Sequence, residues 1–96
     1  MPVGVRSAVD SFSGVSQNIG LGGMFVAIER SLTVGDRCTV EFTLPDHIRP
    51  VSVDAEVRWT RELDDRRVGA GLRFVNLPIG AMVALHDLLR KFDLPA

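Results

Sequence analysis

The sequence predicts a small, mainly antiparallel β domain that ends in one α-helix. Two segments, 37–44 and 51–60, alternate apolar and polar residues with a period of two, which is typical of strands with one buried face. A short connection joins them, so we expect an antiparallel hairpin. After residues 76–78, the apolar residues recur with a helical period. The 96 residues are predicted to form one domain, 1–96, with a small core.

The N-terminal part of the chain is predicted to supply two strands. Residues 3–12 carry valines on one parity, as in a half-buried edge strand, and the small polar residues 13–16 predict a connection. Three glycines between positions 20 and 23 then open into an apolar run. Glycine adopts backbone angles that other residues avoid, so we expect a tight turn followed by a strand at 24–28.

The segment from residue 59 to residue 74 is predicted to contain a hairpin loop and a further strand. Trp59 follows the apolar parity of its strand, and we expect it in the core rather than as an exposed stacking platform. Residues 61–67 are charged and lack an apolar period, which predicts a solvated loop. In the strand at 68–74, Gly69 and Gly71 leave one face bare, and a bulge, another backbone or a ligand can pack there.

The C-terminal helix is predicted from about Pro78 to Phe92. Asn76 and Pro78 suit a helix start, and Arg90 and Lys91 place positive charge near the end, where it complements the helix dipole. The helix should lie across the sheet or its open end. Its expected buried stripe consists of Ile79, Met82, Leu85 or His86, Leu89 and Phe92.

Composition and charge narrow the classes of function. The net charge of −1 argues against a binder of nucleic-acid duplexes, which needs a basic excess to displace counterions from phosphates. The single cysteine, Cys38, cannot form an intramolecular disulfide, which is consistent with a reducing cytoplasm, where we expect the protein. No stretch approaches the roughly 20 apolar residues of a membrane span, so we expect no membrane insertion.

The sequence contains no pattern that predicts catalysis or metal binding. His47 lies in a predicted turn and His86 on the predicted helix, and neither shares a ligand spacing with cysteine or carboxylate residues. Cys38 falls on the apolar parity of a strand, where a thiol is usually an inert small hydrophobe. No serine has the glycine-flanked setting of a nucleophile elbow. We therefore expect a protein that is not an enzyme and that uses no metal or cofactor.

The glycine turn and four later segments resemble the PilZ domain family. Residues 18–23, NIGLGG, are similar to its motif of Asp or Asn, any residue, Ser, any two residues and Gly. Asn18 and Gly23 match, whereas Gly20 stands in place of the serine hydroxyl. The segments GGMFV (22–26), LTVGD (32–36), VRW (57–59) and VGAGLRF (68–74) follow in the family's order. The resemblance spans Gly14 to Phe92 and implies a six-stranded antiparallel barrel with a C-terminal helix.

The resemblance implies a signalling role and leaves two mechanisms open. Family members that bind cyclic di-GMP combine this motif with an earlier Arg-x-x-x-Arg motif, but Arg6 is followed four positions later by Asp10. We therefore expect a regulatory module that acts through protein contacts, as in bacterial motility and type IV pilus systems. The alternative is a direct cyclic di-GMP receptor. Its ligand-binding residues would be Arg6, Asn18, Gly20, Gly22 and Gly23.

Two surfaces are expected to contact a regulatory protein. The first is the glycine turn with Met24 and Phe25, and the second is the part of the helix stripe that the barrel leaves uncovered. Exposed apolar patches of this kind mark interaction sites. A homodimer through either surface is a second arrangement that the sequence allows. The identity of the partner is not encoded in these patterns.

Overall fold

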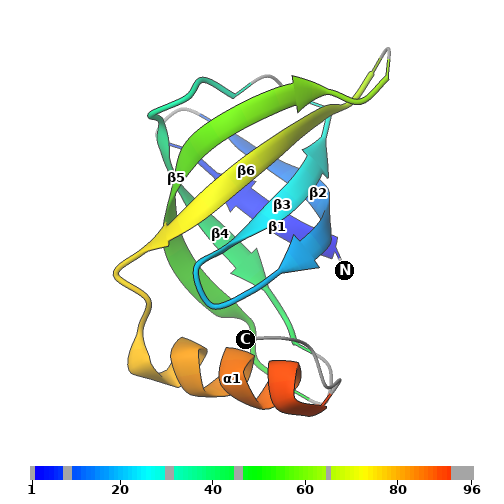
Figure 1. Ribbon diagram of the computed structural model, residues 1–96. Coiled ribbons are helices and arrows are strands. Elements are labelled where there is room, and N and C mark those ends of the chain that lie inside the picture. The colour runs from blue at the N-terminus through cyan, green and yellow to red at the C-terminus, as the bar shows by residue number, and fades with distance from the viewer. Residues whose placement is uncertain (1, 8–9, 30–31, 45–46, 65, 92–96) are drawn as a thin grey trace.

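The structure, a computed structural model, describes residues 2–7, 10–29, 32–44, 47–64 and 66–91. Neighbouring strands are all antiparallel, and they close into a barrel in the order β1-β2-β3-β6-β5-β4. In Figure 1, α1 lies across one open end of the barrel. The predicted fold is thus confirmed. The described residues form β1 (Pro2–Arg6), β2 (Ser11–Ile19), β3 (Gly23–Ile28), β4 (Arg37–Phe42), β5 (Val51–Glu62), β6 (Val68–Val75) and α1 (Ile79–Lys91).

The N-terminal strand differs from the prediction, because residues 3–12 contain the end of β1 and the start of β2. Residues 13–16, predicted as a connection, lie inside β2. β1 pairs with β2 on one side and with β4 on the other, so it is not an edge strand. This second pairing closes the barrel and leaves every strand with two neighbours, which removes the exposed edges of an open sheet.

Two local hydrogen bonds to Asp10 lie in the connection between β1 and β2. The backbone N–H of Ser7 donates to the carbonyl oxygen of Asp10 at 2.8 Å, and the N–H of Ser11 donates to the Asp10 carboxylate at 2.8 Å. An aspartate that accepts hydrogen bonds from nearby backbone groups favours a turn. The alternation of valines within residues 3–12 gives no sign of this reversal, so the sequence predicted one strand where the structure has two.

Inward-facing side chains of the strands fill the barrel. The β4–β5 hairpin is confirmed, with Val40 opposite Val53, and both side chains are buried. Burying one such aliphatic side chain contributes roughly 1.5–3 kcal/mol. Cys38 is also buried; desolvation, followed by the charges of Asp36 and Asp54, raises the pKa of its thiol. The buried apolar strand residues include Val3, Val5, Met24, Val26, Ile28, Phe42, Ala55, Val57, Ala70, Leu72 and Phe74.

An irregularity in β5 reverses the direction of the side chains that follow it. Val57 pairs with Leu72, but the next pair is Trp59 with Gly71, so Arg58 is the extra residue of a β-bulge. One inserted residue inverts a period-two alternation. Trp59 therefore points away from the core and is 45% exposed, and its predicted core position is wrong.

The predicted loop at 61–67 is shorter than expected, because β5 continues through Glu62. Asp64 organises the remaining turn: its carboxylate accepts hydrogen bonds from the backbone N–H groups of Arg66 (3.0 Å) and Arg67 (2.9 Å) and pairs with the Arg67 guanidinium at 2.9 Å. These bonds, the one from Arg66 foremost, lower the pKa of Asp64. In Figure 1, this hairpin projects at the end of the barrel opposite α1.

The helix is confirmed, and its predicted buried stripe is confirmed in part, because Leu85 and Leu89 are buried but other members are exposed. Asn76, at φ 54°, turns the chain between β6 and α1. Ile79 and Met82, both assigned to the buried stripe, are 79% and 46% exposed, and the predicted Phe92 lies outside the described residues. The prediction favoured large apolar residues, whereas two alanines lie on the buried face. That face consists of Ala81, Ala84, Leu85 and Leu89.

We predict that two substitutions on α1 have very different effects on stability. Leu85 is fully buried, so Leu85→Ala should lower the free energy of unfolding by about 2–5 kcal/mol. Met82→Ala, on the exposed side, should change it by about 0.5 kcal/mol or less. Urea denaturation followed by circular dichroism measures both. Equal losses of unfolding free energy in the two variants would show that another face of α1 packs against the barrel.

Candidate functional site

The glycine turn between β2 and β3 is held against β6 by backbone contacts. The N–H of Gly20 donates to the carbonyl of Gly23 at 2.9 Å, and the carbonyl of Gly22 accepts from the N–H of Phe74 at 2.8 Å. A Cβ added to Gly23 would overlap the carbonyl oxygen of Leu72, whereas one added to Gly22 would meet nothing within 4 Å. Glycine at position 23 is therefore required by the close approach of two backbones.

Part of the predicted ligand site comes together beside this turn. Asn18, Gly22 and Gly23 line one open groove of about 320 Å³, and Gly20 is not among its lining residues. Arg58 and Arg73 line the same groove, which the sequence reasoning missed. Arg73 lies directly opposite Gly23 across the β3–β6 pairing, so the strand register brings this cation to the turn.

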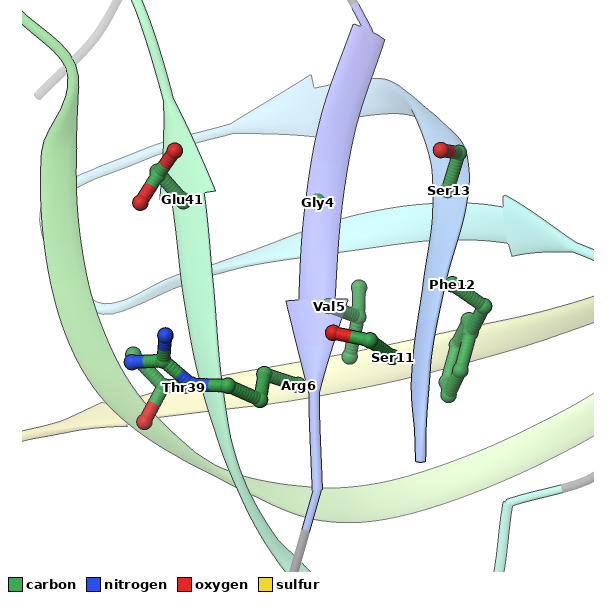
Figure 2. A pocket seen from close by; sticks show the side chains of 8 residues that line it. All are labelled: Gly4, Val5, Arg6, Ser11, Phe12, Ser13, Thr39 and Glu41. Carbon is green, nitrogen blue, oxygen red and sulfur yellow. The ribbon is translucent and has the colours of Figure 1, made fainter. Parts of the chain in front are cut away.

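Arg6 lies in a different place, and the structure does not bring it to Asn18. Arg6 pairs with Ser11 at the start of β2, seven residues before Asn18, which corresponds to about 23 Å along a strand. Figure 2 shows Arg6 beside Thr39, at a second groove of about 330 Å³ on the outside of the barrel. Gly4 forms its floor between the side chains of Ser13 and Glu41. Of the predicted ligand residues, Asn18, Gly22 and Gly23 thus line one groove and Arg6 lines another, while Gly20 lines neither.

Two aromatic rings cover the bare face of β6. Phe25 from β3 and Trp59 from β5 stack with their centroids 5.2 Å apart and an interplanar angle of 17°. A Cβ on Gly69 would lie 2.7 Å from Cε2 of Phe25, and one on Gly71 would lie 2.8 Å from Cδ1 of Trp59. The space left by Gly69 and Gly71 is therefore filled by these rings. Phe25, Trp59, Arg61, Gly69 and Gly71 are called the aromatic face below.

Arg61 lies over both rings of the aromatic face. Its guanidinium carbon is 5.4 Å from the centroid of Phe25 and 5.7 Å from that of Trp59, within the range of cation–π attraction. Phe25 is half-buried, as expected for a residue of a surface. Met24, predicted on the same surface, is only 5% exposed because the alternation of β3 turns its side chain into the core. The expectation that Met24 is exposed is wrong.

Arginines dominate the charge beside the groove. Glu56 pairs with Arg37 at 3.3 Å and with Arg58 at 3.0 Å. The hydrogen bond from Arg58 and the charges of Arg37, Arg58 and Arg73 lower the pKa of Glu56. Within the described part of the chain, Arg73 forms no ion pair. The groove can therefore attract an anionic group.

The described residues contain no group of three histidine, cysteine, aspartate or glutamate side chains that could hold a metal ion. His47 and His86 are both exposed; His47 lies between β4 and β5, and His86 lies on α1. A helix with the length and hydrophobicity needed to cross a membrane is also not found among the described residues. The chemistry that this part of the chain offers is stacking, hydrogen bonding and charge attraction.

The closed barrel, the helix across its end and the groove on its outer wall define a small β-barrel domain that carries its candidate site on the outside. The sequence model of the PilZ domain family matches residues 1–91, and the chain belongs to this family. The suspected family is confirmed. Among curated proteins, no match to the chain was found.

Solved structures with the same fold come from several bacterial proteins. The inhibitor of motility MotI/DgrA of Bacillus subtilis has a TM-score of 0.80 and 21% identity over 95% of this chain, which spans 46% of that one. The PilZ domain of YcgR from Escherichia coli, solved with c-di-GMP, has a TM-score of 0.76 and 17% identity over 96% of this chain and 80% of that one. The PilZ domain of CeSA from a cellulose-synthesizing bacterium has a TM-score of 0.65 and 14% identity over 97% of this chain and 92% of that one.

We predict that Gly23→Ala destabilises the protein while Gly22→Ala does not. The new methyl group at position 23 would push β3 away from the carbonyl oxygen of Leu72, and overpacking of this kind costs about 1–3 kcal/mol. Position 22 has open space. Thermal unfolding of the two variants and the wild type measures the difference. Equal melting temperatures for all three would contradict the close approach of β3 and β6.

Proposed function

We propose that this PilZ domain is a regulatory module without catalytic activity, and that it acts in the bacterial cytoplasm through protein contacts made by the aromatic face. The observation that carries the proposal is Trp59, whose large ring is 45% exposed on the outside of a barrel whose core is filled by other residues. Trp and Arg dominate the binding energy of protein interfaces, and Arg61 lies directly over this ring.

We infer a role in motility or pilus control, and the fold comparison supports the motility part of this inference. MotI/DgrA is described as an inhibitor of motility, and its fold matches that of this chain, although this chain spans only about half of its length. A fold can persist while its site is put to another use, so the proposal rests on the aromatic face and not on the fold. Position 20, where the family motif has a serine, is a glycine, so the motif's hydroxyl group is missing. Gly20 also does not line the groove.

We predict that Trp59→Ser loses the protein partners that the wild type recovers in a pull-down from the source cell. Removing the ring deletes the most exposed aromatic surface of the aromatic face. Val83→Ser on α1, where the side chain is 55% exposed, should recover the same partners as the wild type. Recovery of an unchanged set by Trp59→Ser would overturn the proposal.

A folding control accompanies this comparison. Trp59 covers Gly71, so its loss can lower stability as well as binding. Trp59→Phe keeps a ring on Gly71 and tests whether any aromatic residue suffices. The melting temperature of each variant is measured first, and pull-downs are run at a temperature at which all of them are folded.

Direct binding of cyclic di-GMP is the second candidate function. It is favoured by the convergence of Asn18, Gly22 and Gly23 with Arg58 and Arg73, because guanidinium groups bond phosphate in bidentate fashion. The YcgR domain of the same fold was solved with c-di-GMP. The sequence lacks the Arg-x-x-x-Arg motif and the motif serine. Each lost charge-assisted contact costs about 1.5–3 kcal/mol, or roughly one to two orders of magnitude in affinity.

We predict that isothermal titration with cyclic di-GMP detects no binding at micromolar or tighter affinity. Such binding would instead establish the receptor function. In that case Arg73→Ala should weaken it by about tenfold or more, because Arg73 is a cation of the groove that forms no ion pair among the described residues. Arg6→Ala, in the other groove, should leave it unchanged.

A further inference from the structure

The outer wall of the barrel along β6 concentrates positive charge. Arg61 lies opposite Gly69, Trp59 lies opposite Gly71, and Arg73 is the next outward-facing residue of β6. Arg58 adds a further guanidinium, and Glu56 supplies a carboxylate that is shared by Arg58 and Arg37. The whole chain carries 11 basic and 12 acidic residues, so this cationic wall is a local feature and not a consequence of composition.

Two of these arginines have their charge available for a partner. Within the described residues, neither Arg61 nor Arg73 forms an ion pair. Arg73 lies opposite Glu56, but the Glu56 carboxylate already pairs with Arg37 and Arg58. A guanidinium that stacks on rings keeps N–H donors for a carboxylate. Both arginines are exposed. The wall therefore presents more guanidinium groups than Glu56 can neutralise, with the ring of Trp59 between Arg61 and Arg73.

The spacing of these groups follows the pleat of the strand. Arg61 and Trp59 of β5 lie opposite positions 69 and 71 of β6, and Arg73 is on β6 itself. Along the strand direction the three are separated by steps of two residues, or about 6.6 Å each, and Arg73 is displaced sideways by one strand, or about 4.8 Å. An extended peptide repeats its side chains on one face at the same interval. A carboxylate, an apolar ring and a second carboxylate at every other position of such a peptide would meet Arg61, Trp59 and Arg73 in turn.

We propose that the partner of the aromatic face is an acidic, extended protein segment of the pattern Asp/Glu-x-aromatic-x-Asp/Glu, held by Arg61 and Arg73 on either side of Trp59. This inference rests on the proposed function, since it names the chemistry of the partner at the same face. The partner's ring packs at the Phe25–Trp59 pair, and its carboxylates neutralise the two arginines. Complementary charge supplies specificity and speeds association, while the ring contact supplies most of the affinity.

Synthetic peptides test this chemistry directly. Trp59 is the only tryptophan of the chain, so its fluorescence reports on the aromatic face when the peptide contains phenylalanine. The probe is a capped peptide with the core Glu-Ser-Phe-Ser-Glu. The controls are Lys-Ser-Phe-Ser-Lys and the rearranged Glu-Glu-Phe-Ser-Ser, which keeps the composition and loses the spacing. We expect the first peptide to change Trp59 emission and to bind about tenfold or more tightly than either control, with an affinity that falls as salt rises.

Charge reversal of the protein provides the matched variants. Arg73→Glu should weaken the binding of the acidic peptide by about tenfold or more and should strengthen the binding of the lysine peptide. Arg90→Glu, an exposed arginine of α1, makes the same change in net charge and should leave both affinities as in the wild type. Melting temperatures confirm that both variants are folded, and neither residue is part of the core.

The outcomes separate this inference from the proposed function. Equal binding of the acidic, basic and rearranged peptides, or no binding of any, overturns the inference, while the pull-down with Trp59→Ser decides the proposed function independently. Equal weakening by Arg73→Glu and Arg90→Glu also overturns it, because net charge alone would then explain the effect. A response of Trp59 to cyclic di-GMP and to none of the peptides assigns the face to a nucleotide instead.

Discussion

The absence of side chains at Gly69 and Gly71, on the outer face of β6, is the constraint on which the candidate site depends. Because Gly69 and Gly71 carry no Cβ, the rings of Phe25 and Trp59 can lie against the β6 backbone and stack on each other. Glycine weakens a strand interior, and aromatic side chains from neighbouring strands offset that loss by covering the exposed backbone. Gly23 plays a related part, since it brings β3 close enough to β6 for the groove to form between them.

The parts of the fold that the sequence predicted are those in which alternation runs without interruption. Residues 37–42 and 51–57 alternate cleanly, and both strands were placed correctly. Trp59 was placed on the wrong side because the extra residue Arg58 inverts the alternation, and no glycine or proline marks that bulge. The reversal between β1 and β2 was missed for a similar reason: its hydrogen bonds are local, and the spacing of the apolar residues on either side of it resembles that of one strand.

The residues of the candidate site were likewise predicted where a local pattern marks them and missed where strand pairing brings them together. Asn18 and the glycines that follow it were found from a local motif, and three of the four share a groove. Arg58 and Arg73 were missed because their proximity depends on strand register, which no local pattern of one sequence specifies. Arg6 was included for its charge, but the direction of β1 takes it to another groove. A ligand site built from several strands of a barrel thus becomes predictable only when the pairing of those strands is known.

The rings of Phe25 and Trp59 lie on the backbone of β6 and form a surface on the outside of the barrel. Proton chemical shifts can test this arrangement, because protons under an aromatic ring are shifted upfield. We expect upfield-shifted α-protons for Gly69 and Gly71 in the wild type, and loss of the Gly71 shift in Trp59→Leu. Unshifted α-protons at both glycines would contradict this arrangement and would show that the rings lie elsewhere.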